Sequence, residues 1–161
     1  MIPDRKSQRY LFSAAGLVAL AAFVSLVSLG SAKATNLNPA ALLYKLPAQI
    51  NWVEQPNGAS QAVVAGDLSK PGLYVELVRW HAHHFSRPHF HPNDRFIMVL
   101  SGTWWVGTGA KYDLDNTVPL PAGSFVTHFG KQIHYDGAKD EDTVLEIVGE
   151  GPGTSTPAEV K

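Results

Sequence analysis

Short apolar stretches separated by turn residues dominate the chain from residue 61 onward. Each is rich in Val, Ile, Leu, Trp or Phe, residue types that favour β-strands. The stretches are 61–65, 73–80, 96–100, 103–107, 124–128 and 143–148, with Gly or Pro turns between them. Helical periodicity is missing after Leu46. A series of short strands with Gly/Pro turns predicts an all-β sandwich or barrel.

A different pattern occupies the first 34 residues. Basic residues at the start precede an uncharged apolar run, 10–30, and Ala32-Lys33-Ala34 then gives the small-x-small pattern that a signal peptidase accepts. The alternative is an uncleaved anchor, because about 20 apolar residues could span a bilayer. Small residues in the run and the adjacent cleavage pattern favour an N-terminal signal peptide helix, cleaved after Ala34. We therefore expect a periplasmic or secreted protein with no membrane attachment after cleavage.

The length of 161 residues suits one domain with a sizeable core. We divide the chain into a signal peptide (1–34), an N-terminal arm (35–60), a barrel (61–150) and a flexible tail (151–161). The arm contains an Ala/Leu-rich piece, 39–46, for which we consider a short helix, and we expect the arm to pack on the outside of the barrel. The tail is mostly Gly, Pro, Thr and Ala, a composition too polar to form a core of its own.

Composition and charge exclude several classes of function. Cysteine is absent, so an exported domain of this sequence is held together by burial without disulfides. The full chain has a formal charge of −1; without the leader's four basic residues and one acidic residue, 9 basic and 13 acidic residues remain, a charge of −4. No basic stripe is left for a nucleic-acid partner. No nucleophile motif, phosphate loop or redox cysteine pair is present, so any chemistry has to come from a metal.

All seven histidines fall between His81 and His134, and this clustering is the main functional signal. The sharpest piece is His89-Phe90-His91. On a strand, residues two apart point to the same face, so both imidazoles project together. Two adjacent imidazoles suit Zn, Fe, Ni, Cu or Mn, and further ligands must come from elsewhere in the chain.

The stretch from His89 to Gly102, HFHPNDRFIMVLSG, resembles the first motif of the cupin superfamily. That motif is HxH, three or four residues, Glu, six residues, Gly, and here Arg95 stands at the Glu position. The second motif is Gly, five residues, Pro-x-Gly, two residues, His. It is matched in spacing by Gly123, 129–131 and His134, although Phe129 and Lys131 replace the Pro and the second Gly.

This resemblance covers roughly residues 72–149 and implies a double-stranded β-helix, or jelly-roll, barrel. It also implies that His89, His91 and His134 converge at the barrel mouth as ligands of one divalent metal ion. The metal could be Fe, Mn, Ni, Cu or Zn. Cupins commonly dimerise, so a homodimer is a further expectation.

Arg95 is the important departure from the cupin pattern, because a permanent cation cannot ligate a metal and is repelled by one. Three outcomes are physically reasonable. Arg95 could swing outward and pair with Asp94 or another carboxylate. It could point inward and hold an anionic substrate beside the metal, since its fork matches carboxylates. The site could also have lost its metal and bind an acid through Arg95 and the histidines.

Further residues are candidates for supporting roles. His128 precedes the turn of the second motif and is either a replacement ligand or a hydrogen-bonded wall residue. Asp136 follows His134 by two residues and is expected to orient an imidazole. A second histidine group, at positions 81, 83 and 84, is either a second site or part of the rim. Aromatic and apolar residues, namely Phe96, Met98, Phe125 and the inward one of Trp104 and Trp105, would form a ligand-binding wall or ordinary core.

Two functions fit these features. The first is a metalloenzyme acting on a small organic molecule, with a dioxygenase suggested by analogy at the level of the fold. The alternative is a non-catalytic exported protein that binds or senses a metal or an acidic ligand through Arg95. Metal-free sugar-nucleotide chemistry would need nucleotide-binding basic residues that the sequence does not show. The sequence leaves open whether the protein is an enzyme.

Overall fold

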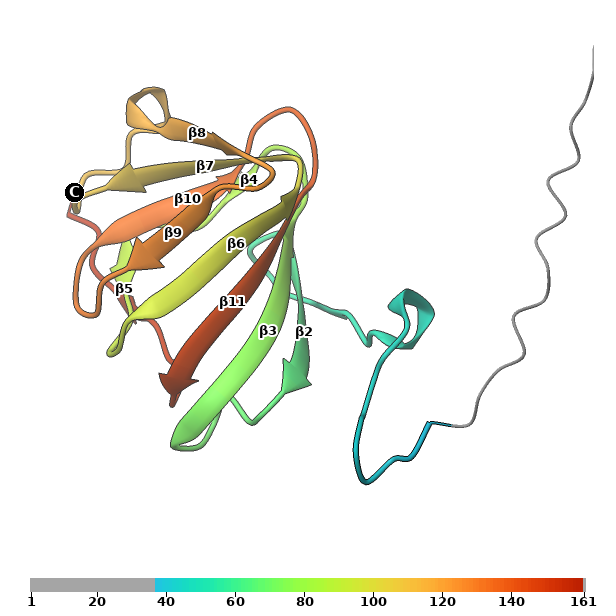
Figure 1. Cartoon of the computed structure of the whole chain (residues 1–161). Coiled ribbons are helices and arrows are strands. Elements are labelled where there is room, and N and C mark those ends of the chain that lie inside the picture. The colour runs from blue at the N-terminus through green and yellow to red at the C-terminus, as the bar shows by residue number, and fades with distance from the viewer. Residues whose placement is uncertain (1–36, 161) are drawn as a thin grey trace, which may run out of the picture. The chain divides into compact units, whose positions relative to one another are not determined.

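The structure is a computed structural model and describes residues 37–160 (Figure 1). The predicted signal peptide, 1–34, lies outside the described residues. Residue contacts divide the chain between Ala41 and Leu42, and every strand belongs to the second unit. In the part of the chain that is described, no helix has the length and apolar character needed to cross a membrane.

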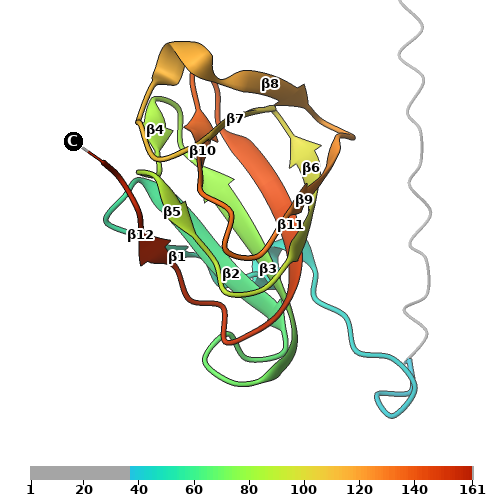
Figure 2. The same ribbon diagram turned by 90° about the vertical axis from the view of Figure 1, so that its left-hand side faces the viewer.

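The second unit consists of two antiparallel sheets (Figures 1 and 2). The first sheet has the order β1 (Val53–Glu54), β2 (Ala59–Ala65), β3 (Gly72–Trp80), β11 (Thr143–Gly151), β6 (Arg95–Ser101) and β9 (Phe125–His128). The second has the order β12 (Thr156–Pro157), β5 (His89–Phe90), β10 (His134–Ala138), β7 (Thr103–Thr108) and β8 (Val118–Pro121), and β4 (His84–Phe85) also pairs with β10. Two short 3-10 helices complete it, η1 (Pro47–Gln49) and η2 (Leu114–Asn116).

Alternation of side chains explains the first sheet. On β3, Tyr74, Val78 and Trp80 are buried, and on β11 Leu145 and Ile147 are buried, while the residues of opposite parity are more exposed. These inward side chains join residues of β6 and β7 in one core cluster. All six strands predicted from the sequence are present, with ends that agree within three residues. The all-β prediction is confirmed.

Two strands of the second sheet carry no hydrophobic pattern. β10 reads HYDGA, and all five of its residues are buried because other strands lie on both sides of it. β8 reads VPLP and lies at the edge of its sheet, where proline is tolerated because no ladder hydrogen bond is lost on the open side. Sequence periodicity therefore predicts neither strand.

The tail differs from the prediction of a flexible segment. β12 pairs with β5, and the backbone N–H groups of Ala158 and Val160 donate to the carbonyls of Pro88 (2.9 Å) and Ala110 (3.0 Å). Arg87 also forms an ion pair with Glu159. Backbone pairing with a sheet edge, which needs no apolar side chains, orders this segment.

The arm also differs in part from the prediction. The helix considered for 39–46 is not formed, and η1 begins only at Pro47. Leu43 is 84% exposed, so this piece does not bury its apolar side chains on the barrel. Trp52 does contact the barrel, because the guanidinium of Arg79 lies 4.4 Å from the centre of its ring.

Candidate metal centre

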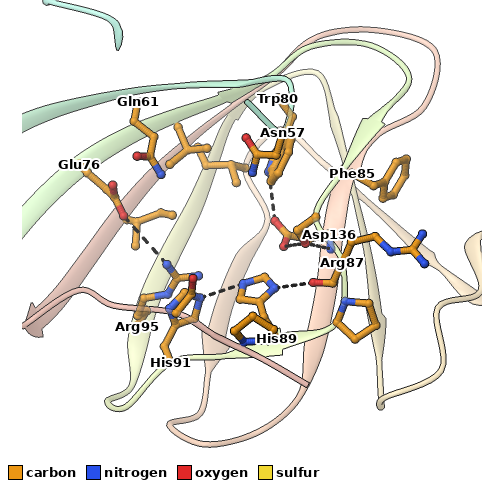
Figure 3. Close-up of a pocket in the computed structure, with 17 residues that line it drawn as sticks. Asn57, Gln61, Glu76, Trp80, Phe85, Arg87, His89, His91, Arg95 and Asp136 are labelled. Atoms are coloured by element: carbon orange, nitrogen blue, oxygen red, sulfur yellow. Dashed lines mark hydrogen bonds and ion pairs between the residues drawn. The ribbon is translucent and has the colours of Figure 1, made fainter. Parts of the chain in front are cut away.

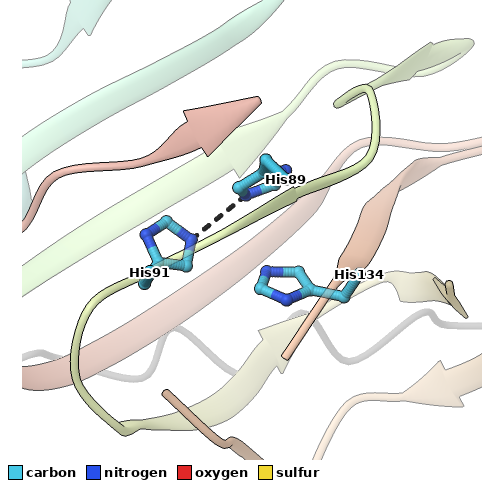
Figure 4. A group of neighbouring side chains, drawn as sticks. All are labelled: His89, His91 and His134. Carbon is cyan, nitrogen blue, oxygen red and sulfur yellow. Dashed lines mark hydrogen bonds between the residues drawn. The ribbon is translucent and has the colours of Figure 1, made fainter. Parts of the chain in front are cut away.

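Strand pairing brings the three predicted histidines together. His134 on β10 is the direct partner of His89 on β5, so a residue distant in sequence reaches the HxH pair through the sheet. One nitrogen from each of His89, His91 and His134 lies within 4.8 Å of the others (Figure 4). In residues 37–160 this is the one group of three or more His, Cys, Asp or Glu side chains with that geometry.

Backbone carbonyls hold each of the three imidazoles in the same tautomer. The Nδ1 atoms of His89, His91 and His134 lie 2.8, 2.9 and 3.1 Å from carbonyl oxygens, which belong to Arg87, Thr154 and Gln132 respectively. A carbonyl can only accept, so each Nδ1 carries the proton and donates it. Each Nε2 is then left with a free lone pair, the form in which histidine binds a metal.

The Nε2 atoms fit a metal ion better than they fit one another. His89 Nε2 and His91 Nε2 are 3.1 Å apart, yet neither has a proton to share when both Nδ1 atoms are protonated. Two nitrogens bound to one ion at about 2.1 Å lie about 3.0–3.4 Å apart at octahedral or tetrahedral angles. His134 Nε2 is buried and has no hydrogen-bond partner in the described structure. The donor set therefore suits a divalent transition metal.

Burial keeps the rings of His91 and His134 neutral. Desolvation lowers the pKa of His91 to about 3, and the nearby charge of Arg95 acts in the same direction. Desolvation likewise lowers the pKa of His134 to about 4. Neutral rings do not have to lose a proton before they bind a metal at neutral pH.

Arg95 points into the barrel. It shares the inward face of β6 with Ile97 and Val99, and only 12% of its side chain is exposed. Its Nη2 lies 3.5 Å from His128 Nδ1. Asp94 does not pair with it and instead accepts a hydrogen bond from the backbone N–H of Gly130 at 2.7 Å. The alternative in which Arg95 swings outward is therefore wrong.

Glu76 is a buried carboxylate that the sequence analysis missed. It lies in the middle of β3, its side chain is 4% exposed, and its Oε1 is 4.0 Å from Arg95 Nη1. Burial raises its pKa, and the charge of Arg95 partly opposes this effect. A signal was present, since Glu76 has the parity of Tyr74, Val78 and Trp80 in an alternating strand. A carboxylate on an apolar face is unusual unless it is paired or functional.

His128 is a wall residue next to the centre. Its ring centroid is 3.8 Å from that of His134 and 5.3 Å from that of Trp104. It does not belong to the group of three convergent ligands. Desolvation and the neighbouring His134 lower its pKa, so this ring is also neutral.

Asp136 supports the core rather than an imidazole. Its Oδ2 accepts hydrogen bonds from the indole N–H groups of Trp80 (3.1 Å) and Trp104 (2.9 Å), and its Oδ1 accepts from Ser86 Oγ at 2.9 Å. No imidazole is hydrogen-bonded to it within residues 37–160. The predicted orienting role is instead filled by the backbone carbonyls described above. Trp104, 1% exposed, is held by this carboxylate as a core residue.

The predicted aromatic wall is largely wrong. Phe96, Met98 and Phe125 are 47%, 38% and 62% exposed, and the rings of Phe96 and Phe125 stack on the outer face of the first sheet. Because Arg95 takes the inward position on β6, Phe96 and Met98 must face outward. Phe96 therefore does not line the barrel cavity.

The second histidine group does not form a site. His81 is held by Ser60 Oγ at 3.0 Å and Asp142 Oδ2 at 3.1 Å. His83 and His84 are exposed, and the imidazole of His84 bonds only to the nearby carbonyl of Ala82 in the described structure. The three rings therefore have separate surroundings at the rim.

A cavity of about 310 Å³ is lined by two of the three histidines, His89 and His91 (Figure 3). Val78, Leu145 and Ile147 give it an apolar side. Its polar lining comes from both sheets, from segments between the strands and from the tail, namely Asn57, Gln61, Glu76, Ser86, Arg87, His89, His91, Arg95, Asp136 and Ser155. This volume suits a small molecule placed beside the proposed ion.

Comparisons with known proteins support the fold. No protein-family model matches the sequence, and no curated protein matches it. Among solved structures, KdgF from Halomonas sp. is similar at 18% identity and a TM-score of 0.53, over 65% of this chain and 89% of that chain. The polyketide cyclase RemF from Streptomyces resistomycificus is similar at 11% identity and a TM-score of 0.62, over 74% of this chain and 87% of that chain.

An RmlC-like cupin from Shewanella frigidimarina is similar at 13% identity and a TM-score of 0.54, over 66% of this chain and 88% of that chain. At such low identity these likenesses concern the fold. They agree with the two motifs and with the arrangement of the two sheets. The chain therefore has the double-stranded β-helix fold of the cupin superfamily.

Proposed function

We propose that this protein binds one divalent metal ion through the Nε2 atoms of His89, His91 and His134 and presents it to a small organic molecule in the barrel cavity. One observation carries the proposal: one nitrogen from each of three imidazoles converges on a common point while a backbone carbonyl engages each Nδ1. This arrangement suits a cation.

The chemistry would come from the ion and the selectivity from the chain. An ion held by His89, His91 and His134 would supply Lewis-acid or redox chemistry to a molecule beside it. Arg95 lies on the cavity wall, where it can hold an acidic group of the molecule. Glu76 partly balances the charge of Arg95 and so reduces its repulsion of a metal.

Enzymatic activity is the function that the neighbours favour. RemF is named a polyketide cyclase, and it matches 74% of this chain. We propose on this basis that the protein is an enzyme, and a dioxygenase is one candidate activity. The inward position of Arg95 favours a second candidate, a non-catalytic protein that binds an acidic ligand. Oxygen consumption and product formation with small enediols, phenols and acids separate the two, since a binding protein saturates without turnover.

The metal proposal is tested by ion content. Wild-type protein, purified and reconstituted, should hold about one transition-metal ion per chain, and His134→Ala should hold almost none while its circular dichroism is unchanged. His83→Asn is the matched control, because His83 is exposed and Asn tolerates its positive φ of 68°. Stoichiometric metal in His134→Ala, or no uptake by the wild type, would rule out this site.

We also propose export, from the pattern of the first 34 residues. Expression of the full chain in a bacterium with a periplasm should give a mature protein that begins at Thr35. The mass of the protein and its fraction after osmotic shock measure this directly. Full-length protein in the membrane fraction would instead support an uncleaved anchor.

A further inference from the structure

Two oppositely charged side chains face the cavity from different strands, Glu76 on β3 and Arg95 on β6 (Figure 3). Their closest charged atoms are 4.0 Å apart, which is too far for a direct hydrogen bond. Glu76 Oε2 and Arg95 Nε are also buried without a hydrogen-bond partner in the described structure. The pair thus leaves one acceptor and one donor unsatisfied beside the cavity.

Such a pair is costly unless something else completes it. Buried polar groups in native proteins nearly always have partners, and an unpaired one destabilises the fold. Bulk water has little access here, since the two side chains are 4% and 12% exposed. A small molecule that brings an acceptor to Arg95 and a donor to Glu76 would satisfy both groups at once.

The charge of the cavity selects the kind of molecule. With both carboxyl groups ionised, Glu76 and Asp136 together with the guanidinium of Arg95 give a single net negative charge, because Arg87 at the wall is already paired with Glu159. A divalent ion on the three histidines reverses this to a single net positive charge. The ion-loaded cavity therefore attracts an anion, and Arg95 offers the fork that matches a carboxylate.

We propose that Glu76 and Arg95 form a recognition subsite for a small hydroxy acid, whose carboxylate accepts from Arg95 and whose hydroxyl donates to Glu76. The inference rests on the metal-binding function proposed above, since the ion makes the cavity positive. An acid without the hydroxyl leaves Glu76 unpaired, and a diol without the carboxylate leaves Arg95 unpaired. A volume of about 310 Å³ limits the ligand to a small skeleton, which the apolar side of the cavity can contact.

Matched ligands test this recognition. Lactate and mandelate are titrated into metal-loaded protein and followed by calorimetry. Each is compared with the acid that lacks the hydroxyl (propionate, phenylacetate) and the diol that lacks the carboxylate (propane-1,2-diol, 1-phenylethane-1,2-diol). We expect a hydroxy acid to bind on the order of 10-fold more tightly than its deoxy acid, and the diols to bind more weakly than either acid.

Variants separate Glu76 from the ion, because a metal can itself chelate a hydroxy acid. Glu76→Gln should reduce the preference for the hydroxyl by on the order of 10-fold, and Arg95→Gln should weaken both acids by a similar factor. Both variants should retain one ion per chain. Glu146→Gln is the control, since this Glu lies in the middle of β11 between the inward-facing Leu145 and Ile147. This variant should change neither the preference for the hydroxyl nor the affinity for the acids.

The outcomes distinguish this inference from the metal proposal, because ion content is measured first. An unchanged hydroxyl preference in Glu76→Gln, or unchanged acid binding in Arg95→Gln, overturns the subsite while the metal function stands. Absence of binding by every ligand of the set to the ion-loaded wild type also overturns it. A wild type that takes up no ion overturns the proposed function and this inference together.

Discussion

The carbonyl of Thr154 connects the C-terminal segment to the candidate metal centre, and deletion of residues 154–161 tests that connection. The deletion removes the acceptor that lies 2.9 Å from His91 Nδ1, together with β12. Loss of a partner that orients a metal-bound histidine typically weakens metal affinity 10–100-fold. We therefore expect the dissociation constant of the ion to rise by about 10–100-fold, equal to about 1.4–2.8 kcal/mol.

The fold should survive this deletion. Each lost backbone hydrogen bond contributes about 0.5–1.5 kcal/mol, but each residue that no longer has to be ordered returns about 1–2 kcal/mol of conformational entropy. The two effects oppose each other, so we expect the barrel to remain folded. The ion's dissociation constant is measured by competition with a chromophoric chelator, and circular dichroism checks the fold.

Glu159→Gln is the control, because it weakens only the exposed ion pair with Arg87 and leaves the carbonyl of Thr154 in place. It should change metal affinity less than twofold. A deletion variant that folds and binds the ion as tightly as the wild type would refute the argument that this carbonyl orients His91.

Three further predictions concern stability. Asp136→Asn should lower the free energy of unfolding by about 2 kcal/mol, because three donors lose a charged acceptor; urea unfolding followed by tryptophan fluorescence measures this, and a change below about 0.5 kcal/mol would contradict it. Lys131→Gly should raise the free energy of unfolding by about 0.5–1 kcal/mol, since Lys131 has a positive φ of 62°; a less stable variant would contradict this. In metal-free protein, the lowered pKa values of His91 (about 3) and His134 (about 4) mean that only the unfolded chain binds protons at these rings as the pH falls below 6.5. Each ring should therefore lower the free energy of unfolding by about 1 kcal/mol between pH 6.5 and 5.5, and a flat urea-unfolding profile over that range would contradict the burial of these rings.

Most of the fold could be predicted because apolar and polar residues alternate along strands of the first sheet. Strands such as β3 and β11 place every second side chain in the core, and this pattern is visible in the sequence. β10 could not be predicted in the same way, since it is covered on both sides and its burial depends on strands distant in sequence. The tail was wrongly predicted to be flexible because backbone pairing orders it, and amino-acid composition does not reveal such pairing.

The candidate site likewise contains residues that the sequence predicts and residues that it does not. The parity of His89 and His91 and the spacing of the second motif to His134 brought three residues together correctly. Phe96 was placed inside because the orientation of β6 was unknown, and the inward position of Arg95 reverses it. Glu76 was missed because its meeting with Arg95 depends on the register of two strands that are separated by β11.

Long-range pairing at the metal centre also has a kinetic consequence. The contact between His91 and Thr154 joins residues that are 63 apart, and His134 reaches His89 only after β10 and β5 have paired. Contacts of this kind form late in folding, since much chain entropy must be lost before they close. An ion would bind the native state but bind the folding transition state only weakly. Its addition should therefore slow unfolding and leave the refolding rate almost unchanged.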